Sequence, residues 1–150
     1  MAAVLAASAA VLAGCSVQHG SIALQVRSFA GTAQLGQSDQ LLATDVAEVG
    51  RGIAEGKLLA THTACDGLAT DAANALGVLP SPDQRLTDEL NRAYLDLARA
   101  AQDCSEVARL GPGAFARYEA ESGRAMASLH AAEARVRLLE AKGHRRRGAG

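Results

Sequence analysis

An evenly spaced apolar stripe between residues 86 and 104 constrains the fold of this chain more than any other feature. The stripe comprises Leu86, Leu90, Ala93, Leu97, Ala100 and Cys104, whose spacing alternates between four and three residues. That spacing is typical of a helix that packs along a seam in a bundle. Alanine dominates the apolar residues, and β-branched and aromatic residues are few, so the composition also favours helix over sheet.

Two other segments carry helical stripes. The first follows Ser38, which suits a helix N-cap, and comprises Leu42, Val46, Val49 and Ile53. The second begins near Ala114 and comprises Phe115, Tyr118, Ser122, Met126, Leu129, Ala132, Val136 and Leu139. Thr63 to Asp66 fits a capping box, so residues 38–76 form either one helix or two, the second beginning near Thr63.

Proline and glycine mark where the helices begin and end. Ser81 suits an N-cap, Pro82 the first helical position, and Gln84 the third position of a capping box. Residues 110–113 break the chain again. We therefore expect an all-α fold, a small antiparallel bundle of three to four helices over residues 38–142. A chain of 150 residues holds about one such domain.

The first residues of the chain resemble an export signal. Residues 2–14 are apolar or small and carry no charge. The run is too short to cross a bilayer, which needs a helix of roughly 20 residues, but it matches the apolar region of a secretory signal. Leu12, Ala13, Gly14 and Cys15 resemble a bacterial lipobox, the motif at which a cysteine is lipidated and the preceding peptide removed. We therefore expect residues 1–14 to be a signal peptide and Cys15 to carry a lipid anchor.

The residues around this motif bear on that interpretation. The sequence turns polar after Cys15, so we assign residues 15–37 to the lipidated cysteine and a flexible tether, within which residues 22–29 are apolar enough for a short helix. No Lys or Arg precedes the apolar run, although a signal normally begins with basic residues. A start codon assigned too far downstream explains their absence. The alternative is an alanine-rich helix buried in the core, with a cysteine by chance.

Cys65 and Cys104 remain as a pair once Cys15 is assigned to lipid. In an exported chain we expect them to form a disulfide. It would close a loop of about 40 residues and stabilise the fold by roughly 3–4 kcal/mol. The alternative is a free, buried pair. A metal site is disfavoured, because His62 is the one nearby ligand and further ligands at suitable spacing are missing.

The positions of the two cysteines pose a geometric problem. Cys65 lies 11 residues before Leu76, whereas Cys104 lies 22 residues after Pro82. In an ideal antiparallel hairpin the cysteines would be offset by about 11 residues, or roughly 16 Å. Disulfide partners need Cα atoms less than about 7 Å apart. Either the connection over residues 73–85 is extended and runs back along the bundle, or no disulfide forms.

The composition disfavours several function classes. The 15 basic and 16 acidic residues nearly cancel, which argues against an electrostatic nucleic-acid binder. Four aromatic residues and no Trp supply few stacking platforms. His62 and Asp66 have the spacing of a hydrogen-bonded pair on a helix, but no Ser or Cys motif supplies a nucleophile. We therefore expect no catalytic residues, cofactor or metal.

Residues 143–150 are assigned to a basic, disordered tail. This tail either contacts anionic surfaces or only keeps the end of the chain soluble.

Part of the chain resembles small helical lipoproteins of high-GC Gram-positive bacteria. The matching residues are Thr63, Ala64, Cys65, Leu79, Pro80, Ser81, Pro82, Asp83, Leu86, Thr87, Leu90, Ala93, Tyr94 and Cys104. With the lipobox they span about half of the chain. The resemblance implies a membrane-tethered, extracytoplasmic helical domain with a cysteine pair, and it carries over no catalytic residue.

These observations predict a monomeric lipoprotein of the cell envelope, anchored on the outer face of the membrane through Cys15. Its helical domain would bind or scaffold another envelope protein without catalysis. The alternative is an extracytoplasmic carrier that holds a small apolar ligand inside the bundle. Small alanine side chains and few aromatics favour tight packing and hence the first function, whereas a large apolar cavity would favour the second.

Overall fold

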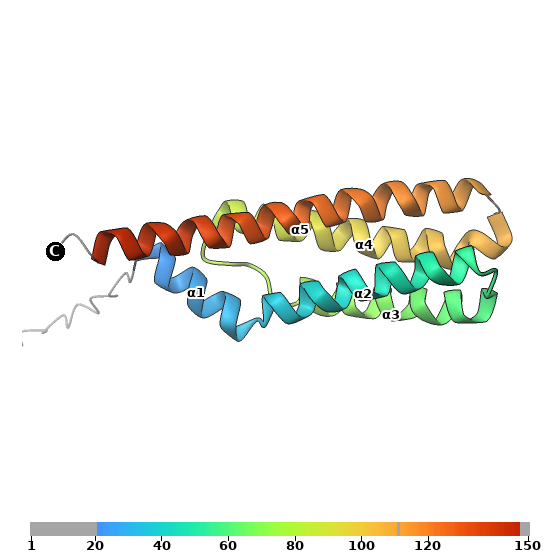
Figure 1. Cartoon of the computed structure of the whole chain (residues 1–150), viewed down its shortest axis with the longest axis horizontal. Helices are drawn as coiled ribbons and strands as arrows, with labels where there is room; N and C mark the ends of the chain where they lie inside the picture. The colour runs from blue at the N-terminus through green and yellow to red at the C-terminus, as the bar shows by residue number, and fades with distance from the viewer. Residues whose placement is uncertain (1–20, 111, 148–150) are drawn as a thin grey trace, which may run out of the picture.

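The computed structural model describes residues 21–110 and 112–147, and within them it contains five α-helices and no strand. The helices are α1 (Ile22–Thr32), α2 (Leu35–Ala54), α3 (Leu58–Leu76), α4 (Gln84–Leu110) and α5 (Pro112–Arg147). Helices α2 to α5 run alternately in opposite directions along one long axis, and α1 packs against α5 (Figure 1). The all-α prediction is confirmed, and the described residues contain one helix more than the predicted three to four, because α1 lies before the predicted start of the bundle at residue 38.

Helix α1 occupies the segment for which the sequence predicts a flexible tether over residues 15–37. Residues 22–32 are helical, so the short helix that residues 22–29 allowed is found and the prediction of a flexible tether is wrong there. Ala23 and Val26 are buried, and α1 approaches α5 so closely that a Cβ added at Gly143 would lie 2.8 Å from the Cβ of Ala23. Gly143 therefore sits inside a helix contact. The predicted disordered tail is helical as far as Arg147.

Residues 38–76 form two helices, and the break falls at Gly56 rather than near Thr63. Gly56 has a φ of 66°, a left-handed conformation that costs glycine little. Just before the turn, a Cβ added at Gly52 would lie 2.5 Å from Oγ1 of Thr61. Gly52 thus lets α2 and α3 approach closely where they are joined.

The connection between α3 and α4 is extended, and α4 begins beyond the end of α3 (Figure 1). Helix α4 begins at Gln84, and its N-cap is Asp83, whose Oδ1 accepts a hydrogen bond of 2.9 Å from the backbone N–H of Leu86. The predicted cap at Ser81 is therefore wrong by two residues. The hydroxyl of Ser81 instead donates to the carbonyl of Asp83 at 2.7 Å and orders the loop before the helix.

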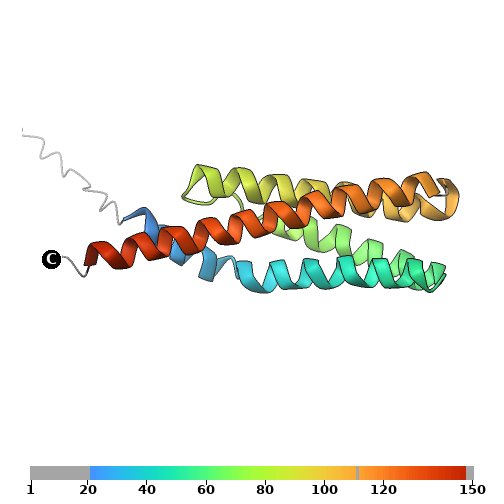
Figure 2. The ribbon, with the colours of Figure 1, turned by 45° about the horizontal axis from the view of Figure 1, so that its top comes forward.

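The core follows the predicted stripes. All six members of the stripe between residues 86 and 104 are buried. Tyr118 of α5 is also buried, and its hydroxyl donates a hydrogen bond of 3.0 Å to the carbonyl of Val46 in α2. Burial raises the pKa of Tyr118 to about 12. Figure 2 shows from a second direction that α4 and α5 lie side by side, with α2 and α3 as the other pair.

Candidate functional site

The predicted lipidation site lies outside the described residues. This holds for Cys15 and for the three residues that complete the lipobox, Leu12, Ala13 and Gly14. The structure therefore bears only on the helical body that the anchor would carry.

Cys65 and Cys104 lie at disulfide distance, with their Cα atoms 5.9 Å apart. Both side chains are buried between α3 and α4. The extended connection over residues 77–83 carries the start of α4 beyond the end of α3 (Figure 1). This compensates the offset that an ideal hairpin would leave. The prediction of an extended connection is therefore confirmed, whereas the prediction that it runs back along the bundle is wrong.

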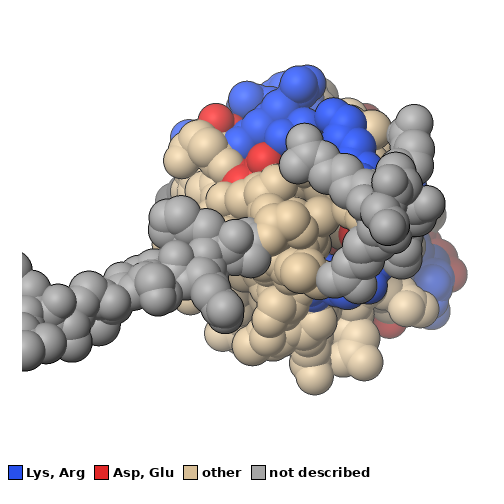
Figure 3. Space-filling view, turned by 90° about the vertical axis from the view of Figure 1, so that its left-hand side faces the viewer, with Lys and Arg blue, Asp and Glu red and all other residues tan. Residues whose placement is uncertain are grey.

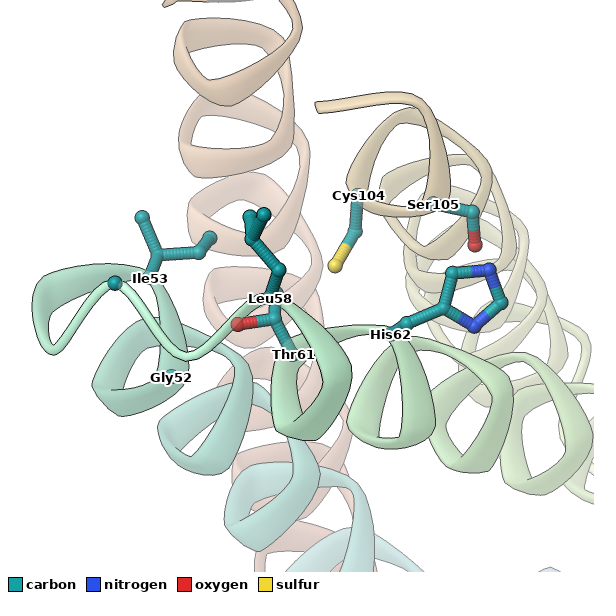
Figure 4. Close-up of a pocket in the computed structure, with 8 residues that line it drawn as sticks. Gly52, Ile53, Leu58, Thr61, His62, Cys104 and Ser105 are labelled. Atoms are coloured by element: carbon teal, nitrogen blue, oxygen red, sulfur yellow. The ribbon is translucent and has the colours of Figure 1, made fainter. Parts of the chain in front are cut away.

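A cavity of about 180 Å³ opens beside Cys104, at the end of the bundle where α2 turns into α3. Figure 4 shows Ile53 and Leu58 on one side of it and His62 on the other, below Ser105 of α4. Gly52 and Gly56 line the cavity and add no side chain to its wall. Its lining is mainly apolar.

Two leucines at the start of α3 stand out from the rest of the surface. Leu58 is 66% exposed and Leu59 is 83% exposed, the highest values among the large apolar side chains that the structure describes as exposed. Scattered apolar residues are ordinary on a protein surface, whereas adjacent ones beside an apolar cavity are typical of an interaction site. We call Ile53, Leu58, Leu59 and the cavity beside them the tip surface.

The polar side chains at the tip surface are not arranged for nucleophilic catalysis. Nδ1 of His62 lies 3.2 Å from Oδ2 of Asp66, so the predicted helix pair forms, but both side chains are more than half exposed. The hydroxyl of Ser105 donates to the carbonyl of Ala101 at 3.1 Å, which directs its proton away from His62. A general base needs a hydrogen bond to the proton that it removes. In this structure His62 is therefore paired with Asp66, and the Ser105 hydroxyl donates to backbone.

Sequence reasoning missed the tip surface, although a signal was present. Leu58 and Leu59 directly follow Gly56 and Lys57. Neighbouring residues of a helix point about 100° apart, so the pair does not fit a single narrow seam. An adjacent leucine pair at the start of a short helix is therefore a candidate for exposure.

None of the described helices is both long and apolar enough to cross a membrane. The described residues also contain no cluster of three or more His, Cys, Asp or Glu side chains that could hold a metal ion. Comparison of the chain with family models, curated proteins and solved structures finds no match.

Proposed function

We propose that the protein is a lipoprotein of the cell envelope, anchored through Cys15 on the outer face of the membrane, whose helical body binds another envelope protein without catalysis. The observation that carries the proposal is the tip surface, where Leu58 lines an apolar cavity and is 66% exposed and the adjacent Leu59 is 83% exposed. The cavity of 180 Å³ is smaller than most small-molecule pockets, which span about 300–1,000 Å³, so a protein side chain is its better occupant.

The placement of the two ends of the body supports an anchored orientation. Helix α1 begins, and α5 finishes, at the end of the bundle opposite the tip surface (Figure 1). Figure 3 faces that end and shows Lys and Arg side chains gathered on part of it. Each basic residue near an anionic membrane adds about 1 kcal/mol of attraction. An anchor before α1 would place this end at the membrane and the tip surface away from it.

The proposed lipid anchor at Cys15 can be tested by mass spectrometry. Mass spectrometry of the membrane fraction is expected to find a chain that begins at Cys15 and carries a diacylglyceryl group, because the lipobox directs both modification and cleavage. The variant Cys15→Ser is the control and is expected to leave the membrane fraction. An unmodified chain that retains residues 1–14 would contradict the anchor.

The role of the tip surface in partner binding can be tested with a double variant. The double variant Leu58→Asn, Leu59→Asn is expected to lower recovery of a cross-linked envelope partner at least tenfold, because removing one leucine from water is worth about 1.5–3 kcal/mol. Cross-linking in intact cells followed by purification in detergent measures the recovery.

The chain offers a matched control for this experiment. Leu41 of α2 and Leu95 of α4 are 47% and 39% exposed and do not line the tip cavity. The double variant Leu41→Asn, Leu95→Asn is expected to keep the partner and the same melting temperature as the tip variant. Equal recovery from both double variants would remove the tip surface as the docking site, and recovery of a second copy of this chain would make it a dimer contact.

A further inference from the structure

A second cavity lies far from the tip surface, where α1 and α2 meet α4 and α5. It is an open groove of about 310 Å³, which is within the range of small-molecule sites. Leu35 of α2, Leu86 and Leu90 of α4, and Val136 of α5 supply apolar walls. The groove is therefore a place where a short apolar chain can leave water.

One carboxyl group breaks the apolar character of this groove. Asp39 lines the groove and is only 8% exposed. It occupies a seam position of α2, four residues after Leu35 and three before Leu42, where the pattern calls for an apolar side chain. A carboxyl group in such a position needs compensation, since burying an unpaired charge is costly.

The compensation that the protein itself supplies is weak. The hydroxyl of Tyr94 donates to Oδ1 of Asp39 at 3.4 Å, which is long for a hydrogen bond between oxygens. Burial raises the pKa of Asp39 to about 6, and the nearby carboxylate of Glu133 acts in the same direction. Asp39 is therefore largely ionised at pH 7.5 and is held by one long hydrogen bond.

The other two charged groups of the groove offset each other. Glu133 and Arg137, both on α5, line it, and Nη1 of Arg137 lies 3.3 Å from Oε2 of Glu133. Those two charges cancel, which leaves the charge of Asp39. Tyr94 of α4 is neutral, because burial and Asp39 raise its pKa above the usual range. The groove thus combines apolar walls with one net negative charge.

We propose that this groove binds a small organic cation, an alkylammonium ion whose ammonium group pairs with Asp39 and whose chain lies along Leu86, Leu90 and Val136. An ammonium group donates up to three hydrogen bonds and supplies the positive charge that Asp39 lacks. A carboxylate ligand would meet the net negative charge of the groove, and a neutral ligand would leave Asp39 uncompensated. This site is independent of the anchor and of the tip surface.

Titration calorimetry of the full chain at pH 7.5 with hexylammonium, 1-hexanol and hexanoate tests the proposal. Hexylammonium is expected to bind at least tenfold more tightly than 1-hexanol, since a hydrogen bond between charged groups is worth about 1.5–3 kcal/mol. Hexanoate is expected to show no binding. Equal binding of hexylammonium and 1-hexanol, or no binding of hexylammonium, would overturn the proposal without recourse to any variant.

A pair of variants on the same helix separates the site from the fold. Asp39→Asn is expected to bring hexylammonium down to the affinity of 1-hexanol. Asp45→Asn is the matched control, because burial and Asp71 raise the pKa of Asp45 to about 6 as well, and Asp45 does not line the groove. Loss of hexylammonium binding in Asp45→Asn but not in Asp39→Asn would also overturn the proposal.

The pH dependence of binding gives a further check. Hexylammonium stays charged between pH 5 and 7.5, whereas Asp39 takes up a proton as the pH falls through about 6. Affinity is therefore expected to fall about tenfold from pH 7.5 to pH 5, as the ionised fraction of Asp39 falls. Glu133 and Arg137 face the same groove, so the comparison is made with Asp39→Asn, which is expected to show a flatter profile. A wild-type profile as flat as that of Asp39→Asn would contradict the role of Asp39.

Discussion

Reduction of the Cys65–Cys104 pair is expected to lower the free energy of unfolding by roughly 3–4 kcal/mol. The two residues are 39 apart in the chain, and a disulfide that closes a loop of about 40 residues removes that much chain entropy from the unfolded state. For a domain of this size the loss corresponds to a fall in melting temperature of roughly 10–15 °C. Thermal unfolding with and without a reductant measures it.

The double variant Cys65→Ala, Cys104→Ala is the control for this measurement. It lacks the crosslink under both conditions, so the reductant is expected to leave its melting temperature unchanged. Both thiols are buried, and the variant therefore also loses some packing beyond the effect of reduction. A wild-type melting temperature that does not respond to complete reduction would show that the pair contributes no crosslink to the fold.

The cysteine pairing also illustrates what the sequence determines. Pairing followed from counting, because one cysteine fitted the lipobox and two remained. The path that brings them together did not, because it depends on how far the connection over residues 77–83 extends. Turn residues indicate where a helix stops but not how far the chain travels before the next helix begins.

The helical seams were predictable, whereas the sequence showed only that residues 22–29 could form a short helix and not what holds that helix in place. The regular spacing from Leu86 to Cys104 repeats over five steps, so its buried face was identified correctly. Helix α1 has only 11 residues, and isolated helices of that length are marginal in water. It is held by contacts with α5, including the close approach of Ala23 to Gly143, which lies 120 residues away in the chain.

The candidate sites were harder to predict than the fold. Asp39 falls in register with Leu35 and Leu42, and a charged residue at a seam position is a visible signal. Whether this charge lines a binding site depends on how the other helices pack around α2. The sequence of α2 alone does not show that packing. The exposed Leu58 and Leu59 likewise become a candidate interaction site only because Leu58 lines a cavity, which the sequence does not show.

Loss of the ion pair between Asp83 and Arg135 is expected to destabilise the fold by about 2–3 kcal/mol. Nε of Arg135 donates to Oδ1 of Asp83 at 3.0 Å, and Nη2 donates to Oδ2 at 2.7 Å. The side chain of Arg135 is 23% exposed and that of Asp83 is 11% exposed, so water replaces the lost partner poorly. The pair joins the start of α4 to α5, and Arg135→Met is expected to show the loss in chemical unfolding.

Two variants of Asp83 separate its role as a cap from its role in the pair. Asp83→Asn keeps an oxygen for the backbone N–H of Leu86, because Asn is as good an N-cap as Asp. Asp83→Ala removes the cap as well and is expected to cost about 1 kcal/mol more. The exposed Arg137, paired with Glu133 on the same helix, is the matched control, and Arg137→Met is expected to change stability by less than about 1 kcal/mol.

The dependence of stability on pH distinguishes this pair from the carboxyl group of Asp39. The Arg135 guanidinium lowers the pKa of Asp83, so the pair stabilises the fold above the unfolded pKa of about 3.9. That stability is lost as the pH falls through the lowered folded pKa, and the gap between the wild type and Arg135→Met is expected to close there. The raised pKa of Asp39, about 6, has the opposite effect, since its ionisation destabilises the fold as the pH rises from about 4 to 6. A gap that persists unchanged below the folded pKa of Asp83 would mean that Arg135 acts through packing rather than through its charge.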